Sequence, residues 1–146
     1  MAQKPSSAAP ARTPDASATD RAARIKLMIF DVDGVFTDGS LYFTAEGDAM
    51  KSFNSLDGHG VKMLQKAGIQ TAIITGRKSG IVAARAKELG ITHLYQGVED
   101  KTVALAELQG ATGIGADACG YMGDDWPDLA GAAAVSRPRP RTHIPK

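Results

Sequence analysis

Two carboxylates one residue apart, Asp31 and Asp33, stand directly after a run of mostly apolar residues. A continuous apolar run that ends in a turn signal is typical of a parallel-sheet strand buried on both faces. Carboxylates at such a buried edge need a cation to offset their desolvation. If a turn at Gly34 swings Asp33 away, one carboxylate can attack as a nucleophile while the other handles a proton. The pair therefore indicates a site at the sheet edge where open α/β folds bind substrates.

Other apolar segments alternate with helical patterns along the chain. The expected strands cover residues 25–30, 69–75, 92–95 and 118–122, and the expected helices cover residues 57–68, 79–89 and 102–108. Gly90 stops the second of these helices, and Asp100 lies near the start of the third. This rhythm predicts an α/β fold, a doubly wound parallel sheet with right-handed crossovers.

Residues 41–43 and 49–53 are extended pieces separated by the turn signal Glu46-Gly47-Asp48. This pattern predicts a β-hairpin in which glycine is available for a positive backbone dihedral. Because the hairpin follows the Asp31 strand at once, we expect it to stand over the catalytic edge as a flap.

The 146 residues allow one small domain, and a formal net charge of +1 argues against a dedicated nucleic-acid surface. Cys119 is the only cysteine, which excludes an intrachain disulfide; its apolar surroundings indicate a small core residue rather than a reactive thiol. No apolar stretch approaches the roughly 20 residues of a membrane helix. We expect a soluble, cytoplasmic protein without a membrane or nucleic-acid partner.

Composition divides the chain into three parts. Residues 1–24 are rich in Ala, Ser, Pro and Thr without apolar periodicity, so we expect a disordered tail. Residues 25–130 carry the expected core. Residues 131–146 contain Pro138 and Pro140 among arginines, which favours an irregular end.

The segment DVDGVFTDG resembles the first motif of the haloacid dehalogenase-like (HAD-like) phosphohydrolases, DxDGxxTDG. FNSLDGHG, IITGRKS, GITHLYQGVEDK and YMGDDWPDL follow in the order found in the phosphatases of 3-deoxy-D-manno-octulosonate 8-phosphate, so the resemblance covers residues 25–129. It implies a HAD-like, Rossmann-type fold without a large cap domain. It also implies a magnesium-dependent phosphomonoesterase of lipopolysaccharide biosynthesis that forms an aspartyl-phosphate and assembles as a homotetramer. The family's last strand, helix and Gly/Arg-rich tail are not matched by residues 131–146.

The resemblance assigns roles to four catalytic residues. Asp31 would be the nucleophile, and Asp33 would protonate the leaving oxygen and later deprotonate water. Thr75 would hydrogen-bond the transferring phosphoryl group. Lys101 would neutralise the nucleophile and the phosphate together.

A magnesium ion suits this chemistry because it binds few carboxylates together with phosphate and water. The expected ligands are Asp31, the backbone carbonyl of Asp33 and Asp124. Asp125 would support the metal from nearby or through water.

Substrate contacts are also carried over by the resemblance. The expected substrate-binding residues are Asp33, Asn54, Ser55, Leu56, Asp57, Gly58, Lys62, Arg77, Arg85 and Lys101. Arginines suit a sugar-acid carboxylate because guanidinium binds carboxylate bidentately. Lys62 stands where relatives often have arginine. For Lys62 and Arg85, a solvated helix face is an equal alternative.

Three other functions remain open at this point. A phosphatase of another sugar-acid phosphate, with nine carbons, would share the same motifs. A phospho-accepting signalling module also phosphorylates an aspartate on a parallel sheet, but it needs no second carboxylate to activate water. An inactive truncated fragment is the third alternative, because of the unusual end of the chain.

Overall fold

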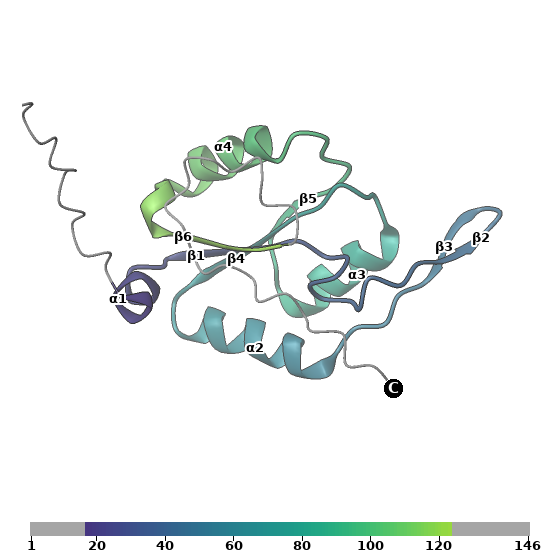
Figure 1. The fold of residues 1–146 in the computed structure, drawn as a ribbon, viewed down its shortest axis with the longest axis horizontal. Helices are drawn as coiled ribbons and strands as arrows, with labels where there is room; N and C mark the ends of the chain where they lie inside the picture. Colours follow the sequence, from purple (N-terminus) through teal and green to yellow (C-terminus); the bar gives the residue numbers. More distant parts are fainter. Residues whose placement is uncertain (1–16, 124–146) are drawn as a thin grey trace, which may run out of the picture.

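A computed structural model of the protein describes residues 17–123, and its centre is a four-stranded parallel sheet (Figure 1). The strands lie in the order β5-β4-β1-β6. Their bounds are Leu27–Phe30 for β1, Gln70–Ile74 for β4, His93–Tyr95 for β5 and Cys119–Met122 for β6. The parallel α/β sheet predicted from the sequence is thus confirmed, and each strand lies within the segment expected for it.

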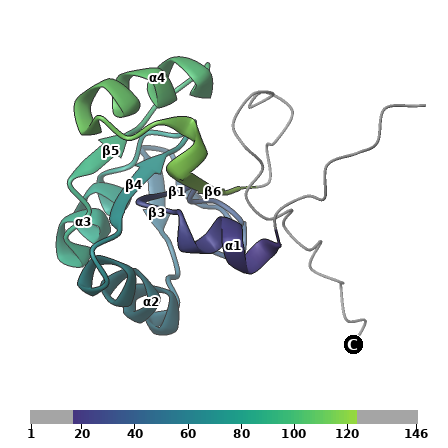
Figure 2. The same cartoon turned by 90° about the vertical axis from the view of Figure 1, so that its left-hand side faces the viewer.

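The helices connect the strands by crossovers on both faces of the sheet. Helix α2 (Ser55–Lys66) leads from β1 to β4, and α3 (Gly80–Leu89) leads from β4 to β5. Helix α4 (Lys101–Thr112) returns to the far side of β1, where β6 pairs. Figure 2 shows α4 on one side of the sheet and α2 and α3 on the other. The strand order therefore reverses between β1 and β6, and the carboxyl ends of these strands form the topological switch point.

Alternating side chains of the central strands fill two separate apolar layers. In β1, Leu27 and Ile29 pack toward α4, in one cluster with Leu108. Phe30 packs on the opposite face, in a cluster with Val61 of α2 and Val82 of α3. The strand is thus buried on both faces, as its uninterrupted apolar sequence predicts.

Local signals at the helix ends agree with the sequence. At the start of α4, the Asp100 side chain accepts hydrogen bonds from the Thr102 hydroxyl and from the Thr102 amide. Both bonds lower the pKa of Asp100, and the bond from the hydroxyl has the larger effect. Gly90 ends α3 in the left-handed region at φ 70°. Helix α4 continues one turn beyond the expected segment because the next such cap is Gly113, at φ 69°.

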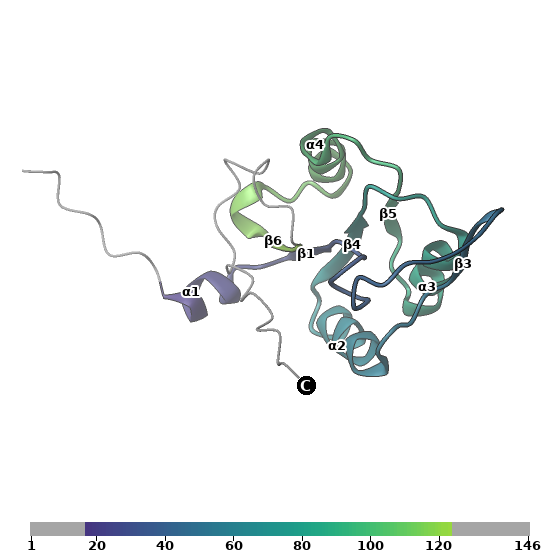
Figure 3. The ribbon, with the colours of Figure 1, turned by 45° about the vertical axis from the view of Figure 1, so that its right-hand side comes forward.

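Strands β2 (Tyr42–Thr44) and β3 (Gly47–Met50) form the expected antiparallel hairpin. The turn lies one or two residues earlier than the sequence indicates, because Gly47 already pairs with Thr44. The hairpin projects from the body of the domain on the side of α3 (Figures 1 and 3). Its function as a flap stays a prediction.

A short helix, α1 (Ala18–Ala23), lies within the part of the tail for which we expected no structure. Its cause is local: the Ser17 side chain accepts from the Asp20 amide, and the Asp20 side chain accepts from the Ser17 amide, a complete capping box. The first strand consequently begins at Leu27 rather than at Ile25, whose amide bonds back to Ala22.

Several sequence-based expectations lie outside the described residues. They are the tail before residue 17, the irregular end and the acidic residues Asp124 and Asp125. Among the described helices, none combines the length and the apolar character needed to span a membrane.

Candidate active site

Asp31 directly follows β1 and lies at the switch point. Its amide donates to the carbonyl of Met122 at 2.9 Å, which ties it to the end of β6. The side chain is buried, and the residue is only 6% exposed. The Val32 amide donates to Asp31 Oδ1 at 2.7 Å, leaving Oδ2 to face other groups. A buried carboxylate fixed in this way needs a cationic partner.

Lys101 supplies that cation from the first residue of α4. Its Nζ donates to Asp31 Oδ2 at 2.7 Å, and both side chains are largely buried. Burial by itself lowers the pKa of Lys101, but the hydrogen bonds to Asp31 and Tyr121 outweigh it and leave the pKa raised. Lys101 is therefore a permanent positive charge beside the carboxylate at neutral pH. The structure thus brings together the two residues that the sequence places 70 positions apart.

Tyr121 lies on β6 and orients this lysine. Lys101 Nζ donates to the Tyr121 hydroxyl at 3.2 Å, and the ammonium lies 6.0 Å from the ring centroid. The ring is buried in the layer beneath α4. The sequence analysis did not identify Tyr121 as a site residue. The one feature of the sequence that could have indicated it is a tyrosine hydroxyl inside an apolar strand, because a buried tyrosine usually has a polar partner.

The turn after Asp33 separates the two carboxylates as expected. Gly34 takes a positive φ of 81°, and the amides of Val35 and Phe36 bond back to the Val32 carbonyl. Thr37 is buried and closes the turn, because its hydroxyl accepts from the Gly34 amide at 3.2 Å. Asp31 and Asp33 consequently contact different cations, so each is held separately.

Asp33 faces two cations. Lys51 Nζ donates to Asp33 Oδ1 at 2.9 Å. Arg77 Nε lies 3.6 Å from Asp33 Oδ2, too far for a hydrogen bond, and the Arg77 side chain is 50% exposed. Such an exposed pair contributes about 0–1 kcal/mol. The sequence analysis expected Arg77 as a substrate contact, not as a partner of Asp33, and it missed Lys51, whose position after β3 gives no sign of its partner.

Thr75 follows β4, the strand next to β1. Ile73 pairs with Phe30, so Thr75 lies at the same edge as Asp31. Its backbone is fixed between the Tyr95 carbonyl and the Val98 amide, and the residue is buried. Asp31, Asp33, Thr75 and Lys101 therefore all lie at one edge, as the sequence analysis predicts.

The donor set at this edge suits an oxygen-binding cation. The Asp31 carboxylate lies at this edge, and the backbone carbonyl of Asp33, the second ligand expected from the resemblance, belongs to the turn that follows; both are hard oxygen ligands of the kind that magnesium prefers. Within residues 17–123, no group of three or more His, Cys, Asp or Glu side chains gathers so as to hold a metal ion. The remaining predicted ligands, Asp124 and Asp125, lie outside the described residues, one and two positions after Gly123.

The expected substrate segment, residues 54–58, forms the first turn of α2. The Asn54 side chain caps the helix by accepting from the Leu56 amide at 2.9 Å. Ser55, Leu56 and Asp57 are exposed, Leu56 by 74%.

Arg85 of α3 packs against this turn. Its guanidinium lies 5.6 Å from the Phe53 ring centroid, and Nη1 bonds Glu88 Oε2 at 2.9 Å. A Cβ on Gly58 would lie 2.6 Å from Arg85 Nη2. The structure therefore brings Arg85 to the expected substrate segment, and Gly58 provides the space for it.

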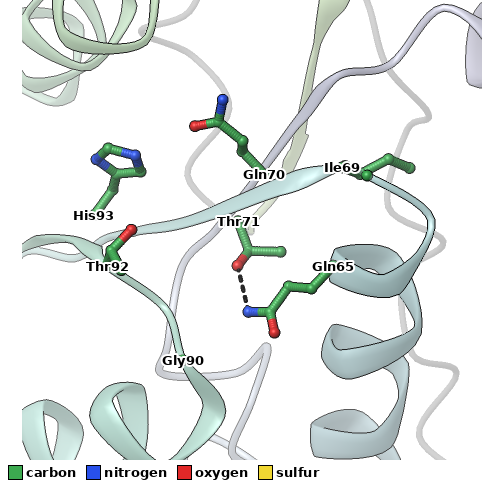
Figure 4. Close-up of a pocket in the computed structure, with 8 residues that line it drawn as sticks. Gln65, Ile69, Gln70, Thr71, Gly90, Thr92 and His93 are labelled. Carbon is green, nitrogen blue, oxygen red and sulfur yellow. Dashed lines mark hydrogen bonds between the residues drawn. The ribbon is translucent and has the colours of Figure 1, made fainter.

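Lys62 is not brought to this edge. Its Nζ lies 3.3 Å from the position that a Cβ on Gly90 would take, at the end of α3. Gly90 lines a different hollow of about 250 Å³, at the amino ends of β4 and β5 (Figure 4). There the Gln65 amide donates to the Thr71 hydroxyl at 2.9 Å. Lys62 lies one helical turn after Gly58, the last residue of the expected substrate segment, and its position does not support the predicted substrate contact.

The sequence and the fold resemble those of known proteins. No family model matches the chain. The 3-deoxy-D-manno-octulosonate 8-phosphate phosphatase of Yersinia pestis is 47% identical over 113 residues, which is 75% of this chain and 60% of that protein. Over the matched residues, the chain is homologous to these phosphatases.

Solved structures agree with this relationship. A Moraxella catarrhalis phosphatase of the same name, in complex with magnesium, phosphate and the sugar acid, matches with a TM-score of 0.72 and 47% identity, over 77% of this chain and 64% of that one. A Legionella pneumophila protein described within the HAD superfamily matches with a TM-score of 0.70 and 47% identity, over 75% of this chain and 60% of that one. The HAD-like sheet is thus confirmed, and residues 17–123 contain no large cap domain. The chain spans about three fifths of the length of the curated relatives that it matches.

Proposed function

We propose that the protein is a magnesium-dependent phosphatase that hydrolyses 3-deoxy-D-manno-octulosonate 8-phosphate through an aspartyl-phosphate. The observation that carries the proposal is the buried ion pair of Asp31 and Lys101 at the switch point, with Asp33 held separately beside it. The high identity to the octulosonate phosphatases supports the choice of substrate.

In the first step, an Asp31 oxygen attacks the phosphorus atom and the ester P–O bond breaks. Asp33, in its protonated form, gives its proton to the leaving sugar oxygen. Lys101 Nζ is already positioned 2.7 Å from Asp31 Oδ2. Its ammonium group can therefore stabilise the negative charge that develops on the phosphoryl oxygens without reorganisation of the site.

In the second step, water attacks the phosphorus atom of the acyl phosphate. The Asp33 carboxylate takes a proton from this water, the bond between phosphorus and Asp31 breaks, and phosphate leaves. Asp31 is regenerated as a carboxylate, which Lys101 again neutralises. The two carboxylates need separate positions for these roles, and the turn at Gly34 provides them.

The metal would be held by the Asp31 carboxylate and the Asp33 carbonyl, with Asp124 as the third protein ligand. When bound, magnesium offsets the repulsion between the nucleophile and the anionic phosphate.

For substrate recognition, we assign the sugar-acid carboxylate to the arginines. Arg77 and Arg85 lie on the α3 side of the site, and Arg85 packs against the exposed first turn of α2. Guanidinium binds carboxylate in two parallel hydrogen bonds.

Assembly as a homotetramer is part of the proposal. The hairpin exposes Tyr42, Phe43 and Met50, and Leu41 beside it is also exposed. Apolar side chains gathered in this way favour contact with another subunit. Light scattering of the purified chain would report the assembly, and a monomer at all concentrations would contradict it.

Phosphate release from a panel of sugar-acid phosphates tests the function. We expect magnesium-dependent turnover with the eight-carbon acid as the best substrate, and loss of turnover in Asp31→Asn. Higher kcat/KM for a nine-carbon acid would reassign the substrate. A stable phosphorylated protein without turnover would contradict the phosphatase.

A further inference from the structure

Lys51 is a buried lysine on the hairpin. It follows Met50, the last residue of β3, and its side chain is only 2% exposed, whereas Met50 is 54% exposed. Lysine is almost never buried unless it is paired, because desolvation of its ammonium group is costly. A lysine in this position therefore needs specific partners.

Its partners are two carboxylates. Lys51 Nζ donates to Asp33 Oδ1 at 2.9 Å and lies 3.9 Å from Asp48 Oδ2 on β3. The Asp48 oxygen is buried and has no hydrogen-bond partner among the described residues, so its contact with Lys51 is electrostatic. The ammonium thus bridges the hairpin and the turn that follows β1.

We propose that Lys51 is the positioning residue of the acid-base Asp33, through which the hairpin fixes the orientation of that carboxyl group. Lys51 makes a direct hydrogen bond from an enclosed position, whereas Arg77 lies beyond hydrogen-bond distance and is half exposed. The nucleophile and the acid-base therefore have separate lysines, Lys101 and Lys51. This inference rests on the proposed function of Asp33.

The physical consequence is a defined direction for proton transfer. A general acid works only when its oxygen lies within hydrogen-bond reach of the leaving group, and small misplacements are costly. Without Lys51, the Asp33 side chain gains rotamers that point away from the substrate. Protonation of the leaving oxygen should then suffer more than nucleophilic attack.

Leaving-group dependence separates these two steps. We would measure kcat/KM of Lys51→Met for 3-deoxy-D-manno-octulosonate 8-phosphate, whose alkoxide needs a proton, and for p-nitrophenyl phosphate, whose phenolate leaves without one. The value of kcat/KM reports only the steps up to formation of the aspartyl-phosphate, so the rate of its later hydrolysis does not affect the comparison. We expect a loss of about 100-fold for the sugar phosphate, and a several-fold smaller loss for the nitrophenyl ester.

Two variants serve as controls. Lys51→Arg keeps a donor cation and should recover part of the activity on the sugar phosphate. Lys66→Met removes an exposed lysine from the end of α2 and should leave both substrates unchanged. Equal losses on both substrates in Lys51→Met, or no loss on either, would overturn the positioning role.

A second measurement does not depend on turnover. A double-mutant cycle of Lys51→Met and Asp33→Asn in urea unfolding reports whether the two side chains interact. We expect a coupling of about tenfold in the unfolding constant. Simple additivity would overturn the inference even if the chain is an active phosphatase. An inactive wild-type chain that retains the coupling would contradict the proposed function alone.

Discussion

Replacement of Lys101 by methionine should separate catalysis from stability. The change keeps an unbranched side chain but removes the ammonium group from Asp31 Oδ2, 2.7 Å away, and from the Tyr121 hydroxyl, 3.2 Å away. Hydrogen bonds to charged groups contribute about 1.5–3 kcal/mol each. The variant also avoids the desolvation of a buried ammonium, which offsets part of this loss. Because the buried Asp31 carboxylate is left without its cation, we expect a net destabilisation of about 3–5 kcal/mol.

The effect on turnover should be larger. Lys101 is fixed where charge moves during phosphoryl transfer, and removal of one such preorganised group costs about 100- to 1,000-fold in kcat. Phosphate release at saturating substrate measures this loss, and urea unfolding followed by circular dichroism measures the stability. Lys66→Met is the matched control, because it removes the same charge from an exposed position.

The pH dependence of the stability difference follows from the raised pKa of Lys101. A raised pKa stabilises the folded chain fully below the ordinary lysine value, and the stabilisation is lost as the pH rises through the raised value. The difference between Lys101→Met and the wild type should therefore be constant between about pH 6 and pH 9. Turnover within threefold of wild type in a folded Lys101→Met protein would refute the proposed role of Lys101 in phosphoryl transfer.

Three further changes test other parts of the site. Gly58→Ala places a Cβ 2.6 Å from Arg85 Nη2, so the guanidinium must shift; we expect KM to rise while stability in urea unfolding changes by less than about 1 kcal/mol, because the better helix propensity of alanine offsets the crowding. Gly60→Ala has nothing within 4 Å and should stabilise the same helix by up to about 1 kcal/mol without a change in KM. Equal effects of the two changes on KM would contradict the packing of Arg85 against Gly58. Thr75→Val should lower kcat by about 100-fold with a stability change within about 1 kcal/mol; unchanged phosphate release would exclude Thr75 from the reaction. Burial raises the pKa of the Cys119 thiol, so alkylation at neutral pH should be slow in the folded chain and rapid in urea; rapid labelling of the folded protein would show that the thiol is accessible.

Local signals made most of the fold predictable. The turn after Asp33, the stop at Gly90 and the cap at Asp100 each depend on residues within one or two turns of chain, so the sequence carries them directly. The order of strands and helices follows from the same signals, together with the handedness of crossovers. The short helix after Ser17 was missed although its capping box is local, because the surrounding composition indicates a tail.

The lysine partners show where sequence reasoning ends. Lys51 and Asp33 are 18 positions apart, and Lys101 and Tyr121 are 20 positions apart. No periodicity links such pairs, because the contacts depend on how the hairpin and α4 pack over the sheet edge. The Asp31–Lys101 contact was expected only through the family resemblance.

The helix-borne cations show the same limit. Arg85 and Lys62 both lie on helices whose spacing allows either a solvated face or a substrate contact. The structure places Arg85 against Phe53 and the first turn of α2, and it places Lys62 beside Gly90. The direction of a long side chain depends on its neighbours in the folded structure, and the sequence pattern of a helix does not identify these neighbours.

Trapping of the covalent intermediate tests the central claim most directly. The full chain would be mixed with substrate and magnesium, quenched in acid within milliseconds and digested for mass spectrometry. We expect a phosphoryl group on the peptide that contains Asp31, and its absence in Asp31→Asn. Phosphate release without phosphorylation of Asp31, or phosphorylation of another residue, would contradict the account.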